Sequence, residues 1–458
     1  MLTGENGILK QATSAKDTTD KLEFEEQVKL AVMAAKTNKT GSINTSDLET
    51  ELNKISGAEI TKSANNELPW TVKKGSYEVT ITANTTGKDD SKKDDDKKDE
   101  DTKIDYGTKK PAEDTRTVKE QATAAKPEGS TIDSATNENT GIVMIDSNQN
   151  EWVWIEVPST VFTSATSSTD YDNIKADLIA YAKDYRDSWT DEWYAMDGST
   201  LVTASTEGLT DAQKALNNGC GLTYNEYNTN YKKMLSSIYT NKGFYIGRYE
   251  AGIEGSDTDT SLARYSRTEI TSSSPKAVSK QNMIPYNNVR CSDAQQLANE
   301  MSTGNKTSSL MYGIQWDLVC KFLEVKGNWD TTTNTAQYYI KENSTSWGNY
   351  GNSGFEINST KARGYANPWK EVSETSKSAG TEILLTTGAS EQNKKMNIYD
   401  FAGNEWEWTL EKTTSTGNPC SFRGGFYLSY GDGYPASSRY NGSTSYSGNG
   451  FGLRVSLY

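Results

Sequence analysis

The sequence predicts an α+β protein with an unusually high loop content. Several segments place apolar residues at helical spacing, and others alternate apolar and polar residues as strands do. From residue 327 onward the chain is rich in Asn, Ser, Thr, Gly and Trp, a composition typical of short strands joined by long loops. Ten of the eleven Trp follow residue 140, so the large core is expected in the C-terminal part.

Residues 1–85 are predicted to form a small helix-plus-hairpin domain. A helix is expected over 8–36, with an apolar stripe made of Phe24, Val28, Ala31, Val32 and Ala35. Ser46 and Glu49 form a capping-box pattern that predicts a second helix. Strands are expected at 70–72 and 77–81, with the turn at Lys74-Gly75.

Residues 86–140 are predicted to be a disordered linker. They contain no Leu, Met, Phe or Trp, and thirteen of the fourteen residues in 88–101 are charged. Such a segment buries too little apolar surface to offset the entropy of ordering it. Because Lys and Asp are interleaved, we expect a solvated spacer rather than a binding tail.

Residues 141–458 are predicted to form the main domain. Strands are expected at 142–145, 152–157 and 243–250, and helices at 171–187, 223–239, 292–301 and 316–323. The segment 397–409 contains Gly403-Asn404, which is turn chemistry, followed by Trp406 and Trp408 in alternation with two Glu. Both Trp rings should therefore face one side of a strand.

Composition excludes several function classes. The net charge is −14 and no basic run is present, which argues against a nucleic-acid partner. The chain has no His, so His-based triads and His-ligated zinc or iron are excluded. Cys220, Cys291, Cys320 and Cys420 form no C-x-x-C pair, and both buried thiols and two disulfides are compatible with their spacing. No run approaches the ~20 apolar residues of a membrane span.

Three motifs occur in series: Gly403-Asn404-Glu405-Trp406-Glu407-Trp408, then Arg423-Gly424-Gly425, then Gly450-Phe451-Gly452-Leu453-Arg454. Over residues 141–458 this series resembles the formylglycine-generating-enzyme and sulfatase-modifying family, whose fold is a variant of the C-type lectin fold. Copper-dependent members of that family need two Cys between the second and third motifs, and its iron-dependent members use His. Both are missing here, so the resemblance implies a protein that is not an enzyme and requires no cofactor.

The same resemblance implies a structural calcium ion. The ligands carried over from the family are the side chains of Asp400 and Glu407 and the backbone carbonyls of Gly403 and Glu405. Oxygen ligands suit calcium. The alternative is that the carboxylates cap loop amides without a metal.

Residues 426–450 have the composition of an antibody binding loop. Eighteen of these 25 residues are Tyr, Ser, Gly or Asn. Tyr supplies stiff amphipathic contact area, and the small polar residues adapt their hydrogen bonds. The segment resembles the variable region in the variable proteins of diversity-generating retroelements, with Pro435, Ala436 and Arg439 as interrupting scaffold residues. The alternative is a loop that only covers the core. The predicted contact residues are Tyr427, Ser429, Tyr430, Asp432, Tyr434, Ser437, Ser438, Tyr440, Asn441, Ser443, Ser445, Tyr446 and Asn449.

Residues 2–35 resemble the start of type IV pilin-like surface proteins of Gram-positive bacteria. This resemblance implies a membrane anchor before Met1, an extracellular location at the cell surface, and assembly through the N-terminal module. The sequence therefore predicts a surface-displayed protein that binds a protein or glycan ligand through its C-terminal face. A formylglycine-type modifying enzyme and a structural pilus subunit are the alternatives.

Overall fold

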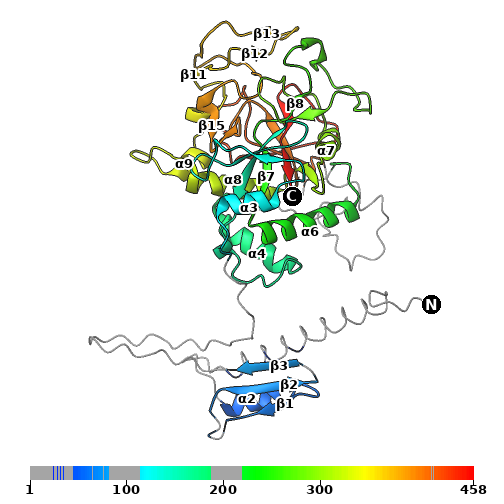
Figure 1. Cartoon of the computed structure of the whole chain (residues 1–458), viewed down its shortest axis with the longest axis vertical. Helices are drawn as coiled ribbons and strands as arrows, with labels where there is room; N and C mark the ends of the chain where they lie inside the picture. The colour runs from blue at the N-terminus through cyan, green and yellow to red at the C-terminus, as the bar shows by residue number, and fades with distance from the viewer. Residues whose placement is uncertain are drawn as a thin grey trace, which may run out of the picture. The chain divides into compact units, whose positions relative to one another are not determined.

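The computed structural model describes residues 45–63, 67–75, 77–81, 114–186, 219–413 and 417–458, together with Phe24, Val28, Ala31, Ala35, Asn65 and Ser415. The chain divides into two compact units, Met1–Ala112 and Glu113–Tyr458. Figure 1 labels the elements of both units. In the part of the chain that is described, no helix is both long enough and apolar enough to cross a membrane.

The N-terminal unit is built on a three-stranded antiparallel sheet in the order β1-β2-β3. Its elements are α2 (Thr45–Leu52), β1 (Glu59–Thr61), β2 (Trp70–Lys74) and β3 (Tyr77–Ile81). Phe24, Val28, Ala31 and Ala35 are helical and buried against this sheet's core, which includes Trp70. The predicted stripe and hairpin are thus confirmed at these positions, while Val32 and most of the predicted helix lie outside the described residues.

The C-terminal unit contains a six-stranded antiparallel sheet in the order β10-β21-β7-β6-β5-β4. Its strands are β4 (Thr131–Ile132), β5 (Val143–Ile145), β6 (Glu151–Glu156), β7 (Gly243–Gly247), β10 (Ser308–Leu310) and β21 (Val455–Leu457). The predicted strands at 142–145, 152–157 and 243–250 are confirmed. The chain's last strand, β21, lies inside the sheet between β10 and β7, so its side chains are buried.

Helices surround the sheets of this unit. They are α3 (Val118–Ala125), α4 (Tyr171–Tyr181), α6 (Tyr224–Asn241), α7 (Cys291–Glu300), α8 (Gly313–Lys326) and α9 (Ala336–Lys341), with 3₁₀ turns at Ser159–Val161, Lys183–Tyr185, Thr260–Leu262, Thr345–Trp347 and Glu391–Asn393. α3 and α6 both pack on β7, and α3, α4 and α6 gather at one end of the unit (Figure 1). The mixed architecture confirms the predicted α+β class.

The predicted linker is wrong over 114–140. Thr117 caps α3 with a capping box, Ala122 is fully buried, and the hydroxyl of Tyr245 donates to the Ala122 carbonyl at 2.6 Å. β4 pairs with β5 in the main sheet. The prediction failed because it relied on the low apolar content of the segment. Two buried alanines and one short edge strand are enough to order it, since the main core supplies the surface against which they pack. Residues 82–113 lie outside the described residues.

A four-stranded sheet, in the order β19-β18-β17-β20, contains all three sequence motifs. Its strands are β17 (Trp406–Lys412), β18 (Cys420–Arg423), β19 (Arg439–Gly442) and β20 (Phe451–Leu453). Short two-stranded ladders complete the loop-rich part: β8 (Gly252–Ile253) with β9 (Ala277–Val278), β11 (Phe355–Glu356) with β14 (Ser376–Lys377), β12 (Arg363–Gly364) with β13 (Lys370–Glu371), and β15 (Lys394–Lys395) with β16 (Ile398–Tyr399).

Candidate functional site

One side of the four-stranded sheet is aromatic. The rings of Trp406 and Trp408 lie 5.1 Å and 5.2 Å from the ring of Phe422 on the neighbouring strand β18. Phe451 of β20 lies 4.9 Å from the same ring. All four side chains are buried. The two Trp therefore face one side of their strand, as predicted, and we call this set the aromatic floor.

We call residues 426–450 the tail. Three of its tyrosines pack on the aromatic floor. Tyr434 lies 5.6 Å from Trp406, Tyr440 lies 5.8 Å from Phe422, and Tyr446 lies 4.8 Å from Phe451. Tyr434 and Tyr440 also contact each other at 6.3 Å. Edge-to-face and offset contacts of this kind fix ring orientation. The floor thus holds one side of each tyrosine ring and leaves the other side to solvent.

Exposed apolar and aromatic surface is concentrated in this segment. Among the residues that the structure describes, six large hydrophobic side chains are exposed, and five of the six fall within 428–446. Their exposed fractions are 41% for Leu428, 57% for Tyr430, 40% for Tyr434, 52% for Tyr440 and 45% for Tyr446. The sixth is Val325 on α8. We call Leu428 and the four exposed tyrosines the tyrosine face.

The predicted polar contact residues lie around the tyrosine face. Asp432 and Ser445 are exposed, and Asp432 accepts a hydrogen bond from Asn352 at 3.2 Å. The others are half-buried: Ser437, Ser438, Asn441, Ser443 and Asn449. Asn449 donates to the hydroxyl of Tyr427 at 3.0 Å, which leaves part of its amide for other partners.

Two predicted contact residues are wrong, because Tyr427 and Ser429 are buried. The hydroxyl of Ser429 accepts from the Phe426 amide at 3.0 Å and donates to the Phe426 carbonyl at 2.8 Å, so it closes a turn. Tyr427 packs below the surface, and burial raises the pKa of its hydroxyl. Composition could not separate these two from the exposed Tyr and Ser. Leu428 lies between these two buried residues and is exposed.

The predicted scaffold residues of the tail are buried or anchored. Ala436 is fully buried, and its carbonyl accepts from the Trp316 indole at 3.0 Å. Arg439 donates to Glu411 at 2.8 Å and to Asp317 at 2.5 Å. These contacts fix the segment at two points between its exposed tyrosines.

Arg439 belongs to a buried ionic network on the side of the sheet opposite the aromatic floor. Arg423 donates to Glu411 at 2.7 Å and to Asp317 at 2.9 Å, and all three side chains are fully buried. Arg186 donates to the second oxygen of Asp317 at 2.9 Å. Burial alone would raise the pKa of Glu411, but Arg439 and Arg423 outweigh it and lower that pKa to about 2. We call these five residues the arginine network.

The predicted calcium ligands lie in a second buried cluster, beside Glu250. The carboxylate of Glu250 accepts a hydrogen bond from the side-chain amide of Asn404 at 2.6 Å and one from the backbone amide of Glu405 at 3.1 Å. Asp400 accepts from the Gly388 amide at 2.7 Å. Burial is the main cause that raises the pKa of Glu407 to about 7 and that of Asp400 to about 6.

This second cluster does not fit a calcium ion as arranged. Arg454 donates to both oxygens of Glu407, at 2.7 Å to one and 3.1 Å to the other, and neutralises it. Glu405 is also fully buried, and burial raises the pKa of its carboxyl well above the usual range although Asn287 lies beside it. In the described ranges no group of three or more acidic or Cys side chains has a metal-holding arrangement. Calcium binding at these residues stays an untested prediction, and this geometry opposes it.

The family model of the sulfatase-modifying factor enzyme 1-like domain matches residues 223–457, just over half of the chain. The chain belongs to this family. The predicted family resemblance of the C-terminal unit is therefore confirmed.

The chain was also compared with curated proteins and with solved structures. Comparison with curated proteins gave no match. Among solved structures, the chain is similar to Treponema denticola variable protein 1 at 15% identity and a TM-score of 0.26, over 47% of this chain and 84% of that chain. The pilin-like character of residues 1–85 stays a prediction.

Proposed function

We propose that this protein binds a protein or glycan ligand through the tyrosine face, and that it does not carry out the chemistry of the family's enzymes. The observation that carries the proposal is the concentration of exposed aromatic side chains in 428–446. Contiguous exposed apolar patches on soluble proteins mark interaction sites. Tyr is also among the residues that dominate binding energy at interfaces.

The tyrosine face is preorganised. Tyr434, Tyr440 and Tyr446 are already oriented by ring contacts with Trp406, Phe422 and Phe451, so little rotamer freedom remains to be lost on binding. Ser437, Ser438, Asn441 and Ser443 surround these rings with hydroxyl and amide groups that can hydrogen-bond either a peptide or a sugar.

We further propose that 426–450 is the variable region of a diversity-generating retroelement target. Support comes from the separation of the segment into anchored and exposed positions. Ala436 and Arg439 hold the backbone, while Leu428, Tyr430, Asp432, Tyr434, Tyr440, Ser445 and Tyr446 are exposed. The neighbouring DNA tests this directly: a near-repeat of the 3′ coding end that differs at adenines, beside a reverse transcriptase gene, is expected. Its absence would contradict the retroelement assignment and leave the binding proposal standing.

The binding proposal is tested with a variant in which Tyr430, Tyr434, Tyr440 and Tyr446 are all replaced by Ser. Purified wild-type protein is screened on an immobilised glycan array and against a library of displayed proteins, and each hit is measured again with the variant. We expect at least about a hundredfold loss of affinity, since hot-spot residues each contribute about 2 kcal/mol or more. Val325→Ser is the matched control, because Val325 is exposed to the same fraction as Tyr430 but lies elsewhere. Hits that bind the variant and wild type equally would contradict the proposal.

The enzyme alternative has little support from the residues. No Cys occurs after Cys420, so the interval between Gly425 and Gly450 lacks the two thiols that the family's copper chemistry requires, and the chain has no His. A copper titration combined with an assay for oxidation of a Cys-containing peptide would revive this alternative if either gave a signal. We also propose that the protein is anchored at the cell surface and lies outside the cell, as the pilin-like resemblance of residues 2–35 implies. The pilus-subunit alternative would be favoured if the purified protein polymerised through residues 1–85.

A further inference from the structure

Three cysteine thiols meet beneath the tail, outside the tyrosine face and the two charged clusters. Cys220 precedes α6, Cys291 is the first residue of α7, and Cys420 is the first residue of β18. All three are buried. They come from positions far apart in the sequence, and no spacing pattern links them.

Several contacts place these thiols together. The thiol of Cys291 interacts with that of Cys420 and has Cys220 and Lys412 as further neighbours. It also approaches the Thr409 carbonyl of β17 at 3.8 Å. Lys412 is the cross-strand partner of Cys420 in the β17–β18 ladder. Gly219, the neighbour of Cys220, also lies close to Cys420. A Cβ atom at Gly219 would be only 2.5 Å from the Cys420 sulfur.

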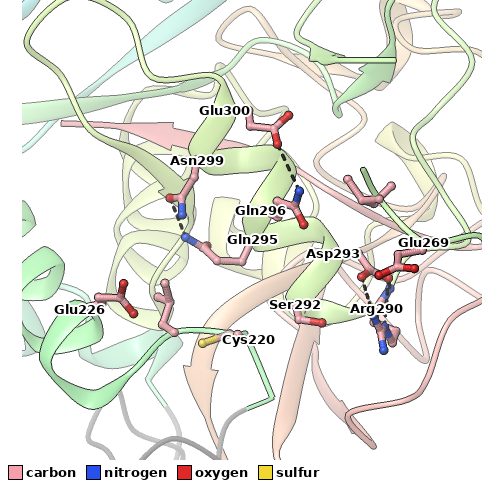
Figure 2. Close-up of a pocket in the computed structure, with 13 residues that line it drawn as sticks. Cys220, Glu226, Glu269, Arg290, Ser292, Asp293, Gln295, Gln296, Asn299 and Glu300 are labelled. Atoms are coloured by element: carbon pink, nitrogen blue, oxygen red, sulfur yellow. Dashed lines mark hydrogen bonds and ion pairs between the residues drawn. The ribbon is translucent and has the colours of Figure 1, made fainter. Parts of the chain in front are cut away.

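A cavity of about 530 Å³ gives solvent a route to this cluster. Cys220 is among its lining residues, together with Arg290, Ser292 and Gln295. Figure 2 shows Cys220 among the residues that line the cavity. Of the three thiols in the cluster, Cys220 is the one that lines this cavity.

Lys412 supplies a group that can accept a thiol proton. Its side chain is fully buried, and burial lowers the pKa of its ammonium to about 7. Near neutral pH part of the Lys412 population is thus the neutral amine. A thiolate, not a thiol, attacks a disulfide, and the contact with Cys420 together with burial raises the pKa of the Cys291 thiol, so a nearby proton acceptor matters.

We propose that Cys291 and Cys420 are an oxidisable pair that forms a disulfide bond by exchange with a small-molecule disulfide admitted at Cys220. The Cys220 thiolate attacks the reagent and releases one small thiol. Cys420 then attacks the small-molecule sulfur of the mixed disulfide and releases the Cys220 thiol. Cys291 attacks the Cys420 sulfur, which forms the Cys291–Cys420 bond and releases the second small thiol. In sum two protein thiols lose two electrons and two protons, which reduce the reagent to two small thiols.

The bond would connect α7 to the strand that carries Phe422 of the aromatic floor. Cys420 pairs with Gly442 of β19, and Thr444 of the tail lies against the backbone at Gly219. A cross-link between residues so distant in sequence constrains the unfolded chain and stabilises the folded one. Oxidation would therefore stiffen the support of the tail without occupying its surface.

The test uses the full-length protein, reduced and then incubated with oxidised glutathione at neutral pH. Mass spectrometry is expected to show a loss of about 2 Da, and peptide mapping a Cys291–Cys420 linkage. Cys291→Ser and Cys420→Ser should each abolish the linkage. Cys320→Ser is the matched control, because Cys320 is equally buried but has Asp317, Arg423 and Arg439 as neighbours instead. Cys220→Ser and Lys412→Met should each slow bond formation at least about tenfold while leaving the final product unchanged.

Two results would overturn the inference. Wild-type protein that retains four titratable thiols in denaturant after the incubation would show that the pair does not oxidise. A stable glutathione adduct on Cys220, with no linkage between the other two, would show that they do not resolve it. Both readings come from wild-type protein and so do not depend on the folding of any variant.

Discussion

The two sides of the four-stranded sheet differ in what their side chains do. On one side the arginine network pairs Arg423 with Glu411 and Asp317, all fully buried. On the other side, the aromatic floor supports three tyrosines, Tyr434, Tyr440 and Tyr446, that are 40–52% exposed. Strand β19 serves both, since it carries Arg439 into the network and Tyr440 onto the floor. Consecutive residues of one strand can thus anchor the scaffold and present a binding surface, so substitutions at neighbouring positions should have very different consequences.

The largest expected effect comes from Arg423→Met. The substitution leaves Glu411 and Asp317 buried with fewer cationic partners, and removal of one member of a buried ion pair costs about 3–5 kcal/mol. Urea unfolding followed by tryptophan fluorescence measures the change in unfolding free energy. Arg267→Met is the control, because its 3.6 Å ion pair with Asp293 is partly exposed and should contribute about 0–1 kcal/mol. Equal destabilisation by both substitutions would contradict the distinction between network and surface.

The second prediction compares two aromatic residues in contact, Phe422 and Tyr440. Phe422→Ala should destabilise the protein by about 3–5 kcal/mol, because it opens a cavity in the aromatic floor. Tyr440→Ser should cost about 1 kcal/mol or less, because the ring is half exposed and loses only its floor contacts. The measurement is again the free energy of unfolding. A Tyr440 variant as unstable as the Phe422 variant would assign Tyr440 to the core and not to the tyrosine face.

The third prediction concerns the stability of the folded protein at acidic pH. The pKa of Glu411 is lowered from 4.5 to about 2 in the folded protein. A lowered folded-state pKa means that the contribution of Glu411 to stability is present above about pH 4.5 and is lost as the pH falls toward 2. Glu411→Gln should therefore reduce stability at pH 7 and flatten the decline between pH 4.5 and 2, whereas the exposed control Glu128→Gln should leave the wild-type curve unchanged. A wild-type slope in the Glu411 variant would show that other groups cause the acid sensitivity.

The smallest expected effect is that of calcium. Because Glu407 is already paired with Arg454, addition of calcium or a chelator should leave the melting temperature unchanged. Differential scanning calorimetry with and without the ion measures this. A clear rise in melting temperature with calcium would restore the site implied by the family resemblance and would require Arg454 to move.

Much of the fold could be predicted from periodicity. The strands expected at 152–157 and 406–409 and the helical stripe in 223–239 all correspond to elements in the structure. The strands β6 and β17 are buried on both faces, whereas α6 buries the one face that carries the stripe. The prediction failed over 114–140, where the segment has too few apolar residues to be recognised alone. Its order depends on a surface supplied by β5 and β7, and single-sequence composition does not report such a surface.

The sequence was enough to predict which segment forms the candidate site, but not which of its side chains are exposed. Tyr427 and Tyr430 are indistinguishable by type, yet one is buried and the other exposed, because the turn closed by Ser429 directs them differently. The opposite charges that hold Arg439 lie at 317 and 411, too far away in sequence to be read from the tail. For the four Cys the sequence allows either buried thiols or two disulfides. All four are free and buried in the structure, and the proximity of three of them could be seen only there.

The central claim is that the tyrosine face is the surface that binds ligand. The most direct measurement is hydrogen-exchange or carbene footprinting of the protein alone and in complex with a ligand from the glycan or protein screen. The account predicts that protection on binding is confined to 428–446 and the loop at Asn352 that contacts Asp432. Protection centred on the cavity at Cys220, or on the 410 Å³ cavity lined by Lys394 and Asn139, with 428–446 unchanged, would contradict it.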